Sequence, residues 1–170
     1  MEIVVADANI FVYFFITGLI NKILNSSDLN IKITQTVYRE LTNNYRITTE
    51  YPMLSEIIIN AVHNINASNN LECIDFNTRE LNVDALNIYY HLDNRGNLDP
   101  GELDSIPLAY DLNAIFVTND NDAIVTANEV AQNFGRMTPL AISFLIFCEN
   151  LLERNIIDKN ELERINALFQ

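Results

Sequence analysis

Residues 2–6 read EIVVA, and Asp7-Ala8-Asn9 follows at once. A short apolar run without polar alternation is typical of a strand that is buried on both faces. Similar runs follow along the chain, at Ile31–Thr34, Leu71–Asp75, Ala114–Thr118 and, shorter, Arg136–Thr138. Helical patterns occupy the intervals, at residues 10–25, 36–43, 54–65, 78–92, 102–112, 139–154 and 159–169. This alternation predicts a three-layer α/β/α fold with a central, mostly parallel sheet of four to five strands.

Length and patterning indicate one domain over residues 1–170, with the helices of residues 139–170 packed on it. Two of the predicted helix starts have clear capping chemistry. Thr138 precedes Pro139, and proline suits the first position of a helix. Asp158 is followed three residues later by Glu161, which is the spacing of a capping box.

The composition narrows the class of protein. Hydrophobic residues make up 49% of the chain, enough for a core, which excludes an intrinsically disordered protein. Lys and Arg number 10 against 23 Asp and Glu, so the formal net charge is −13. This balance argues against a protein that coats nucleic acid or anionic lipid with a basic face. It does not argue against an enzyme that meets nucleic acid through metal ions.

The cysteines and the apolar segments indicate the compartment. Cys73 and Cys148 have no CxxC spacing, so we expect two buried, reduced thiols. The apolar run Ile10–Ile20 is about half of the roughly 20 residues that span a bilayer, and it follows an acidic start, unlike a signal peptide. We therefore expect a cytoplasmic protein without membrane contact.

Acidic residues stand at the ends of the predicted strands. Asp7 directly follows the first strand, and Glu40 lies in the helix after the second. The remaining acids flank the fourth strand, in the helix before it and the turn after it: Glu102, Asp104, Asp120 and Asp122. Taken singly, each fits an ordinary helix cap or first-turn acid. Because ligands bind outside the carboxyl ends of parallel strands, their common location predicts a functional site.

The residue types at this edge indicate the chemistry. Carboxylates gathered without a nearby Lys repel one another, so such a site needs a cation. Oxygen ligands without His or Cys select hard ions, and we expect Mg²⁺ or Mn²⁺ rather than Zn²⁺. Ions of this kind activate water and clamp phosphate, which makes phosphodiester hydrolysis the expected reaction.

The same motifs resemble those of the PIN-domain ribonucleases, the family of the VapC-type toxins and of several RNA-processing nucleases. The matching segments occur in the right order over nearly the whole chain: Asp7-Ala8-Asn9, Glu40-Leu41, Gly101-Glu102-Leu103-Asp104-Ser105, Val117-Thr118-Asn119-Asp120 and Gly135–Pro139. Each motif is short, so specificity comes from the set. The resemblance implies an endoribonuclease that hydrolyses single-stranded RNA by in-line attack of a metal-activated water.

The resemblance also implies which acids carry the reaction. The catalytic and metal-binding acids would be Asp7, Glu40, Asp104 and Asp120. Asp122 would be an additional ligand or a substitute for Asp120. The choice between these two, and between one and two metal ions, stays open.

Supporting roles are implied for several neighbours. Asn9 would orient Asp7, Thr118 would lie beside the bound phosphate, and Glu102 would be an outer-sphere partner of Asp104. Five cations are candidates for weak contacts to RNA phosphates outside the metal site: Lys32, Arg39, Arg46, Arg95 and Arg136.

Other prominent residues have plainer interpretations. The aromatic run between Phe11 and Phe15 fits the core face of the first helix plus an oligomer contact better than a base-stacking platform. Homodimers are common in the resembling family, so we expect a homodimer and, for a toxin, an antitoxin protein as partner. His63 and His91 have no second ligand at metal spacing and are expected to be structural or surface residues.

Two other functions compete with the ribonuclease. One is a catalytically inactive PIN fold that serves as a binding module, although every expected acid is present. The other is a phosphoaspartyl receiver-like domain, which is less favoured because the first strand ends in Asp7 alone and no Lys follows a predicted strand. Toxin and RNA-processing roles share one chemistry.

Overall fold

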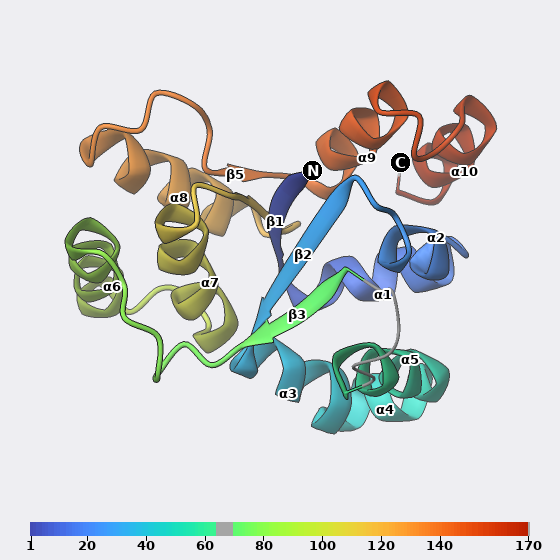
Figure 1. Ribbon diagram of the computed structural model, residues 1–170, viewed down its shortest axis with the longest axis horizontal. Coiled ribbons are helices and arrows are strands. Elements are labelled where there is room, and N and C mark those ends of the chain that lie inside the picture. The colour runs from blue at the N-terminus through green and yellow to red at the C-terminus, as the bar shows by residue number, and fades with distance from the viewer. Residues whose placement is uncertain (64–69, 170) are drawn as a thin grey trace.

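The computed structural model describes residues 1–63 and 70–169. Within them, five strands form one sheet in the order β3-β2-β1-β4-β5, and every neighbouring pair is parallel (Figure 1). The strands are β1 (Glu2–Ala6), β2 (Leu29–Thr34), β3 (Leu71–Ile74), β4 (Ile115–Val117) and β5 (Ala141–Ile142). The predicted α/β/α fold with a central parallel sheet is confirmed.

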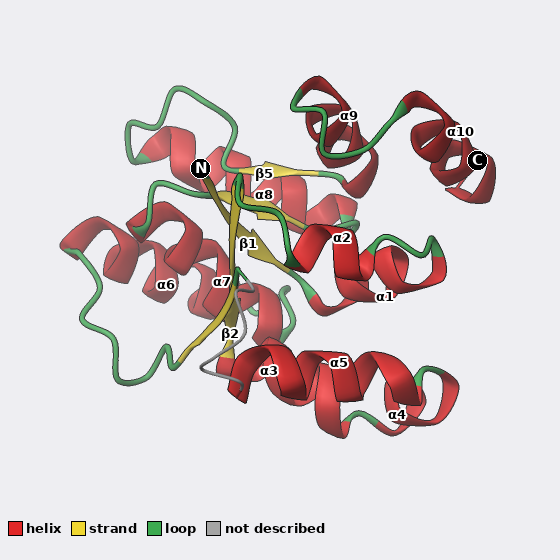
Figure 2. Ribbon diagram, turned by 45° about the vertical axis from the view of Figure 1, so that its right-hand side comes forward, coloured by secondary structure: helices red, strands yellow, loops and turns green. Residues whose placement is uncertain are grey.

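Helices cover both faces of the sheet (Figure 2). One face carries α6 (Val83–Arg95), α7 (Pro100–Asp111) and α8 (Asn121–Asn133). The remaining helices lie on the other side: α1 (Ala8–Ile16), α2 (Ile20–Leu24), α3 (Gln35–Asn43), α4 (Tyr45–Glu50), α5 (Pro52–His63), α9 (Phe144–Glu153) and α10 (Lys159–Phe169).

The core is divided by the sheet into two hydrophobic clusters. Successive residues of a strand point to opposite faces, and on β1 Val4 and Ala6 belong to one cluster while Val5 belongs to the other. All three are buried, as the EIVVA run predicts. The acid that follows this strand is therefore held at the centre of the sheet's carboxyl edge.

Two predicted helices differ in extent from those found. The pattern over residues 10–25 forms two helices, α1 and α2, because the chain turns at Gly18, whose φ of 74° is left-handed. The pattern over residues 54–65 begins earlier, at Pro52, and its predicted end lies outside the described residues. The short helix α4 was not predicted.

The segment between β4 and α9 departs most from the prediction. Residues 121–133 form α8, which the pattern did not predict because its buried face consists mostly of small residues: Ala123, Thr126, Ala127, Val130 and Ala131. The fifth strand is Ala141–Ile142 rather than Arg136–Thr138, and Thr138-Pro139 starts no helix. Ser143 caps α9 instead, accepting a hydrogen bond from the amide of Ile146.

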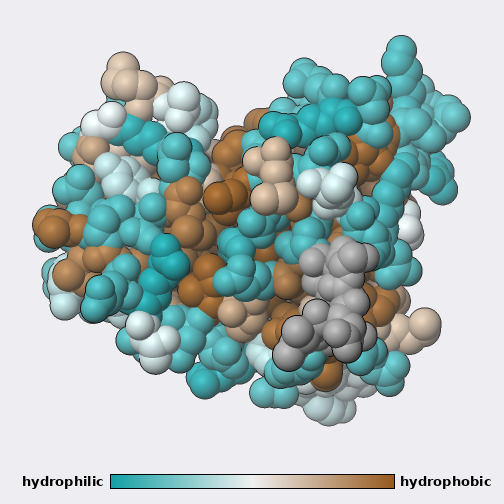
Figure 3. Space-filling model, viewed as in Figure 1, coloured by the Kyte–Doolittle hydropathy of each residue, from teal (hydrophilic) through white to brown (hydrophobic). Residues whose placement is uncertain are grey.

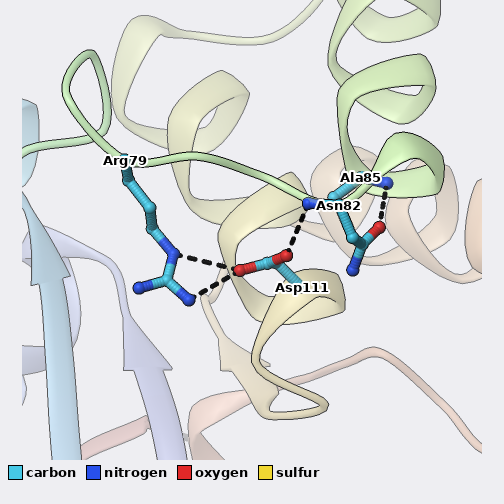
Figure 4. A network of polar contacts seen from close by, with 4 residues as sticks. All are labelled: Arg79, Asn82, Ala85 and Asp111. Carbon is cyan, nitrogen blue, oxygen red and sulfur yellow. Dashed lines mark hydrogen bonds and ion pairs between the residues drawn. The ribbon is translucent and has the colours of Figure 1, made fainter.

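The helix predicted at residues 78–92 begins at Val83, because residues 75–82 form a crossover loop that is tied to α7 (Figure 4). Asp111, the last residue of α7, accepts hydrogen bonds from Arg79 Nε at 3.0 Å and Nη2 at 2.7 Å. It also accepts one from the amide of Asn82 at 2.9 Å, and the Asn82 side chain caps α6 at the amide of Ala85. This network joins the start of α6 to the end of α7.

The last helix follows the prediction closely, whereas α9 begins at Phe144 rather than at Pro139. Asp158 and Glu161 form the predicted capping box at the start of α10, with hydrogen bonds of 2.8 and 2.9 Å.

Of the two free thiols, Cys148 is buried as expected, whereas Cys73 on β3 is only half-buried. Among the described residues, no helix has the length and apolar character needed to cross a membrane.

Candidate active site

Asp7 lies where β1 ends and α1 begins. Its Oδ1 accepts a 2.7 Å hydrogen bond from the amide of Ala8, and so caps α1. Its Oδ2 accepts longer hydrogen bonds, each of 3.4 Å, from Asn9 Nδ2 and Thr118 Oγ1. Asp7 is only 5% exposed. This burial raises the pKa of Asp7 to about 6, even though the Ala8 amide acts in the opposite direction.

Glu40 approaches the same place from α3. A Cβ at Gly101 on α7 would lie 3.1 Å from Glu40 Oε1 and 3.3 Å from Asp99 Oδ1, so a larger residue there would press on both carboxylates. Burial, followed by the negative charges of Asp99 and Asp7, raises the pKa of Glu40 to about 7.

Glu102 and Asp99 form a capping box at the start of α7. Asp99 Oδ1 accepts from the amide of Glu102 at 2.8 Å, and Glu102 Oε2 accepts from the amide of Asp99 at 3.2 Å. Glu102 is 6% exposed. Burial and the charge of Asp99, with smaller contributions from Asp120 and Asp7, raise the pKa of Glu102 to about 7.

Asp120 follows β4 and caps α8. Its Oδ1 accepts hydrogen bonds from the amides of Asp122 at 2.8 Å and Ala123 at 2.9 Å. Its own amide donates to Thr118 Oγ1, and the same hydroxyl donates to Asp7. Thr118 therefore links the acids that follow β1 and β4.

We call Asp7, Glu40, Asp99, Glu102 and Asp120 the acidic cluster. Its members come from the carboxyl ends of β1 and β4 and from α3 and α7. Several of them raise one another's pKa across these elements. No ion pair joins any of the five to a Lys or Arg within residues 1–63 and 70–169.

Asp104 and Asp122 occupy different surroundings. Asp104 Oδ2 accepts a 2.6 Å hydrogen bond from Thr36 Oγ1 on α3, and its charge acts on Tyr89. Burial raises the pKa of Asp104, and the Thr36 hydrogen bond lowers it. Asp122 is exposed in the first turn of α8. Of the two acids predicted on α7, the structure thus places Glu102 in the acidic cluster and Asp104 beside Thr36.

A cleft of about 530 Å³ opens onto the cluster. Asp7, Glu40 and Asp99 line one end of it. The rest of its wall comes from α1, α4 and their flanks: Ala8, Asn9, Val12, Tyr13, Ile16, Asn44, Arg46, Ile47 and Tyr51. Its volume lies within the range of about 300 to 1,000 Å³ that is usual for small-ligand sites.

Three of the cations predicted to contact RNA lie apart from one another. Arg39 on α3 and Arg95 at the end of α6 are exposed. Arg136 donates a 2.9 Å hydrogen bond to the carbonyl of Ala114, just before β4 begins, so it lies at the amino edge of the sheet, opposite the acids. There it lines a second hollow of about 770 Å³ together with Arg154. On the face of the molecule drawn in Figure 3, hydrophilic and hydrophobic side chains are interspersed.

Sequence reasoning missed Asp99 among the residues of the cleft. This residue had a readable signal, since Asp99-Pro100-Gly101-Glu102 combines a capping box with proline at the first helical position. Arg46, one of the cations predicted to contact RNA, lines the cleft from the short helix α4.

The aromatic run of α1 lies mainly in the core. Phe11 and Phe14 are buried, and the ring of Tyr13 packs against Phe169 with centroids 4.6 Å apart. The oligomer contact assigned to this run stays a prediction.

The histidines have structural or surface roles, as expected: His63 Nε2 is 2.9 Å from the hydroxyl of Tyr38, and His91 is exposed.

The donor set of the acidic cluster suits a hard divalent cation, because it consists of carboxylate oxygens. No three His, Cys, Asp or Glu side chains of the described residues converge as a ready-made metal site. To hold a cation, the carboxylates of the cluster must move closer together. Exposed Asp99 and Asp120 are the members with most freedom to do so.

The chain was compared with family models, with curated proteins and with solved structures. No family model matches it, and no curated protein matches it significantly. Among solved structures, it is similar to a PilT N-terminus domain protein from the hyperthermophilic archaeon Sulfolobus solfataricus P2. The identity is 15% and the TM-score 0.44, over 90% of this chain and 92% of that chain.

Proposed function

We propose that this protein is an endoribonuclease that depends on Mg²⁺ or Mn²⁺ and hydrolyses single-stranded RNA at the acidic cluster. The observation that carries the proposal is a group of carboxylates at the carboxyl edge of a parallel sheet, three of which line a cleft and none of which pairs with a Lys or Arg of the described residues. Such a group is costly unless a ligand neutralises it, because burial and mutual repulsion both disfavour the charged forms. A metal ion that bridges the acids to a phosphate satisfies this requirement. The order of the sequence motifs, which resembles that of PIN-domain ribonucleases, supports the same chemistry.

The residues at the carboxyl edge of the sheet would have two roles, to hold the cation and to position Asp7. Asp7, Glu40, Glu102 and Asp120 would hold the cation, with Asp99 beside them. Asn9 and Thr118 hold Oδ2 of Asp7 through the hydrogen bonds described above. A bound ion of this type lowers the pKa of a coordinated water and offsets the charge of the phosphate.

The pKa of about 7 for Glu40 belongs to the cluster without a cation, and a bound cation would lower it. An acid of the cluster that does not hold the cation would take up the proton of the attacking water. Single-stranded RNA is the favoured substrate because its backbone bends into a cleft without breaking base pairs.

The proposal is tested by cleavage of a fluorescently labelled single-stranded RNA in Mg²⁺ or Mn²⁺. We expect cleavage that EDTA and Asp7→Asn each abolish, with circular dichroism showing an unchanged fold. Asp84→Asn is the matched control, because Asp84 is an exposed acid on α6 outside the cluster, and it should cleave normally. Full activity of the Asp7→Asn variant, or activity unaffected by EDTA, would contradict the proposal.

One biological role that fits this activity is that of a cytoplasmic toxin, which an antitoxin protein would bind. Expression of the chain alone should then arrest growth, and the Asp7→Asn variant should not. Arrest that persists in the variant would rule out a toxin that acts by this cleavage.

A further inference from the structure

The residues that line the cleft at the acidic cluster fall into chemically different groups. Asp7, Glu40 and Asp99 are the acidic group, which we call the acidic end. The apolar group, which we call the apolar wall, consists of Val12, Tyr13 and Ile16 from α1, Ile47 from α4 and Tyr51 just after it. Ile16 is 44% exposed although it is a large aliphatic residue. The proposed phosphate-cleaving chemistry uses only the acidic end.

One cation stands in this cleft. Arg46 is the single Lys or Arg among the described residues that line it. Its side chain is 79% exposed, and its ion pair with Glu50 is long, at 3.4 Å. An exposed pair of this kind holds the guanidinium weakly, so the group is free to contact an anion in the cleft.

We propose, on the basis of the function proposed above, that the wall formed by α1 and α4 is a nucleobase subsite. It would hold the base of a nucleotide next to the scissile phosphate, while Arg46 contacts a neighbouring phosphate. A base is flat and uncharged, and it stacks on aromatic and apolar side chains whatever its identity. The volume of about 530 Å³ leaves room for such a ligand beside the acids.

The charge of the molecule favours this mode of binding. With a net charge of −13, a strand of RNA is not held by a broad basic surface. Contacts that do not depend on charge must then supply much of the affinity. A segment of protein would leave the acidic end unmatched, whereas a nucleotide places its phosphate there, with a cation, and its base on the apolar wall.

The absence of Trp from the sequence allows a direct test. Ile16→Trp places a single fluorescent reporter on the wall, at a position that is already exposed. Tyr90→Trp is the matched reporter on α6; Tyr90 is 56% exposed and lines a separate aromatic hollow with Phe76 and Tyr89. Each variant is titrated with an eight-nucleotide single-stranded RNA in Ca²⁺, and gel electrophoresis confirms that the RNA stays intact.

We expect RNA to quench or shift the emission of the Ile16→Trp variant and to leave that of the Tyr90→Trp variant unchanged. An abasic oligonucleotide of the same length should produce a much smaller change. A response at position 90 alone, or an equal response to the abasic strand, would overturn the base subsite.

Arg46 is tested by kinetics in Mg²⁺ or Mn²⁺. Arg46→Ala should raise KM about tenfold with little change in kcat, and should reduce the salt slope of binding by about 0.7, the value for one phosphate contact to a single strand. Arg164→Ala, an exposed arginine on α10, is the control and should change neither. Equal effects of the two substitutions would remove Arg46 from the subsite.

The two proposals fail in different ways. If the protein cleaves RNA but neither position 16 nor Arg46 responds, the nucleobase subsite is wrong and the ribonuclease stands. If RNA is neither cleaved nor bound with Mg²⁺, Mn²⁺ or Ca²⁺, the ribonuclease is wrong and the subsite falls with it.

Discussion

Asp7 shows how a single residue can be placed at a cost to stability. It is nearly buried and has a pKa of about 6, so near neutral pH the folded protein confines a charge that the unfolded chain would expose to water. Its hydrogen bonds with Ala8, Asn9 and Thr118 offset part of this cost. A cation would offset much more of it.

The first prediction concerns pH and stability without added metal. Because folded Asp7, Glu40 and Glu102 have raised pKa values of about 6, 7 and 7, the folded state binds more protons than the unfolded state between about pH 4 and 7. The free energy of unfolding should therefore fall as pH rises through this window. For Asp7 the loss is on the order of 3 kcal/mol.

Urea unfolding in EDTA at several pH values measures this effect. Asp7→Asn should flatten the decline and unfold at higher urea concentration than the parent at pH 8. A parent protein whose unfolding free energy rises from pH 5 to pH 8 would contradict the assignment of these carboxyls.

The second prediction concerns Gly101. The added methyl of Gly101→Ala would meet Glu40 Oε1 at 3.1 Å and Asp99 Oδ1 at 3.3 Å, so one carboxylate must move. We expect at least a tenfold loss of RNA cleavage, with a change in unfolding free energy of about 1 kcal/mol or less. The stability change should shrink when Glu40→Ala is also present, because the clash is then partly removed. Equal stability changes in both backgrounds would show that Glu40 is not the group displaced.

The third prediction separates the two acids of α7. Glu102→Gln should reduce cleavage by a factor of about 100 or more, because Glu102 belongs to the acidic cluster. Asp104→Asn should reduce it far less, because the amide oxygen can still accept the hydrogen bond from Thr36. Cleavage rates at saturating Mn²⁺ decide the matter, and the reverse order of effects would restore Asp104 as the metal ligand of this helix.

At the scale of elements, α7 joins the site to the rest of the fold. Its first turn supplies Asp99, Gly101 and Glu102, and its last residue, Asp111, anchors the loop that leads to α6. Its packing against α3 is reinforced by the hydrogen bond between Thr36 and Asp104. The position of the acidic cluster therefore depends on contacts at both ends of one helix.

The fourth prediction tests the anchor at the end of this helix. Asp111→Ala removes three hydrogen bonds and leaves the partly buried Arg79 guanidinium without its partner. We expect a loss of about 2 to 3 kcal/mol in unfolding free energy. Glu80→Ala, an exposed acid in the same loop, should change stability by less than about 0.5 kcal/mol. Thermal unfolding of the two variants makes the comparison, and equal melting temperatures would show that the loop is held by other contacts.

The elements that could be predicted from sequence are those with strong local signals. EIVVA reads as a buried strand because β-branched residues follow one another, and α10 reads as a helix because its capping box is followed by Leu162, Ile165 and Phe169 at helical spacing. Helix α8 was not predicted from the sequence, because the alanines on its buried face differ little in hydrophobicity from the residues around them.

The site was predictable only in part, for a geometric reason. Acids directly after a strand, such as Asp7 and Asp120, are placed by the topology of a parallel sheet. The choice between Glu102 and Asp104 depends on how α7 is rotated against α3, and that rotation follows from long-range packing at Gly101.

At the scale of the whole molecule, the net charge of −13 makes the protein sensitive to cations. The fifth prediction is that Mn²⁺ stabilises the protein at pH 8, by about 2.7 kcal/mol at a concentration 100 times its dissociation constant. Asp7→Asn should lose most of this gain. NaCl at equal ionic strength is the control and should give a much smaller change, since screening does not replace a bound ion. Equal stabilisation by the two salts would argue against a specific site.

The capping box of α7 has a consequence for spectroscopy. Glu102 Oε2 accepts a hydrogen bond from the amide of Asp99, so this amide responds directly to a displacement of a carboxylate of the acidic cluster. If a cation draws that oxygen away, the amide of Asp99 exchanges with solvent faster and its nuclear resonance moves. One backbone signal would then report occupancy of the site in solution, without substrate and without turnover.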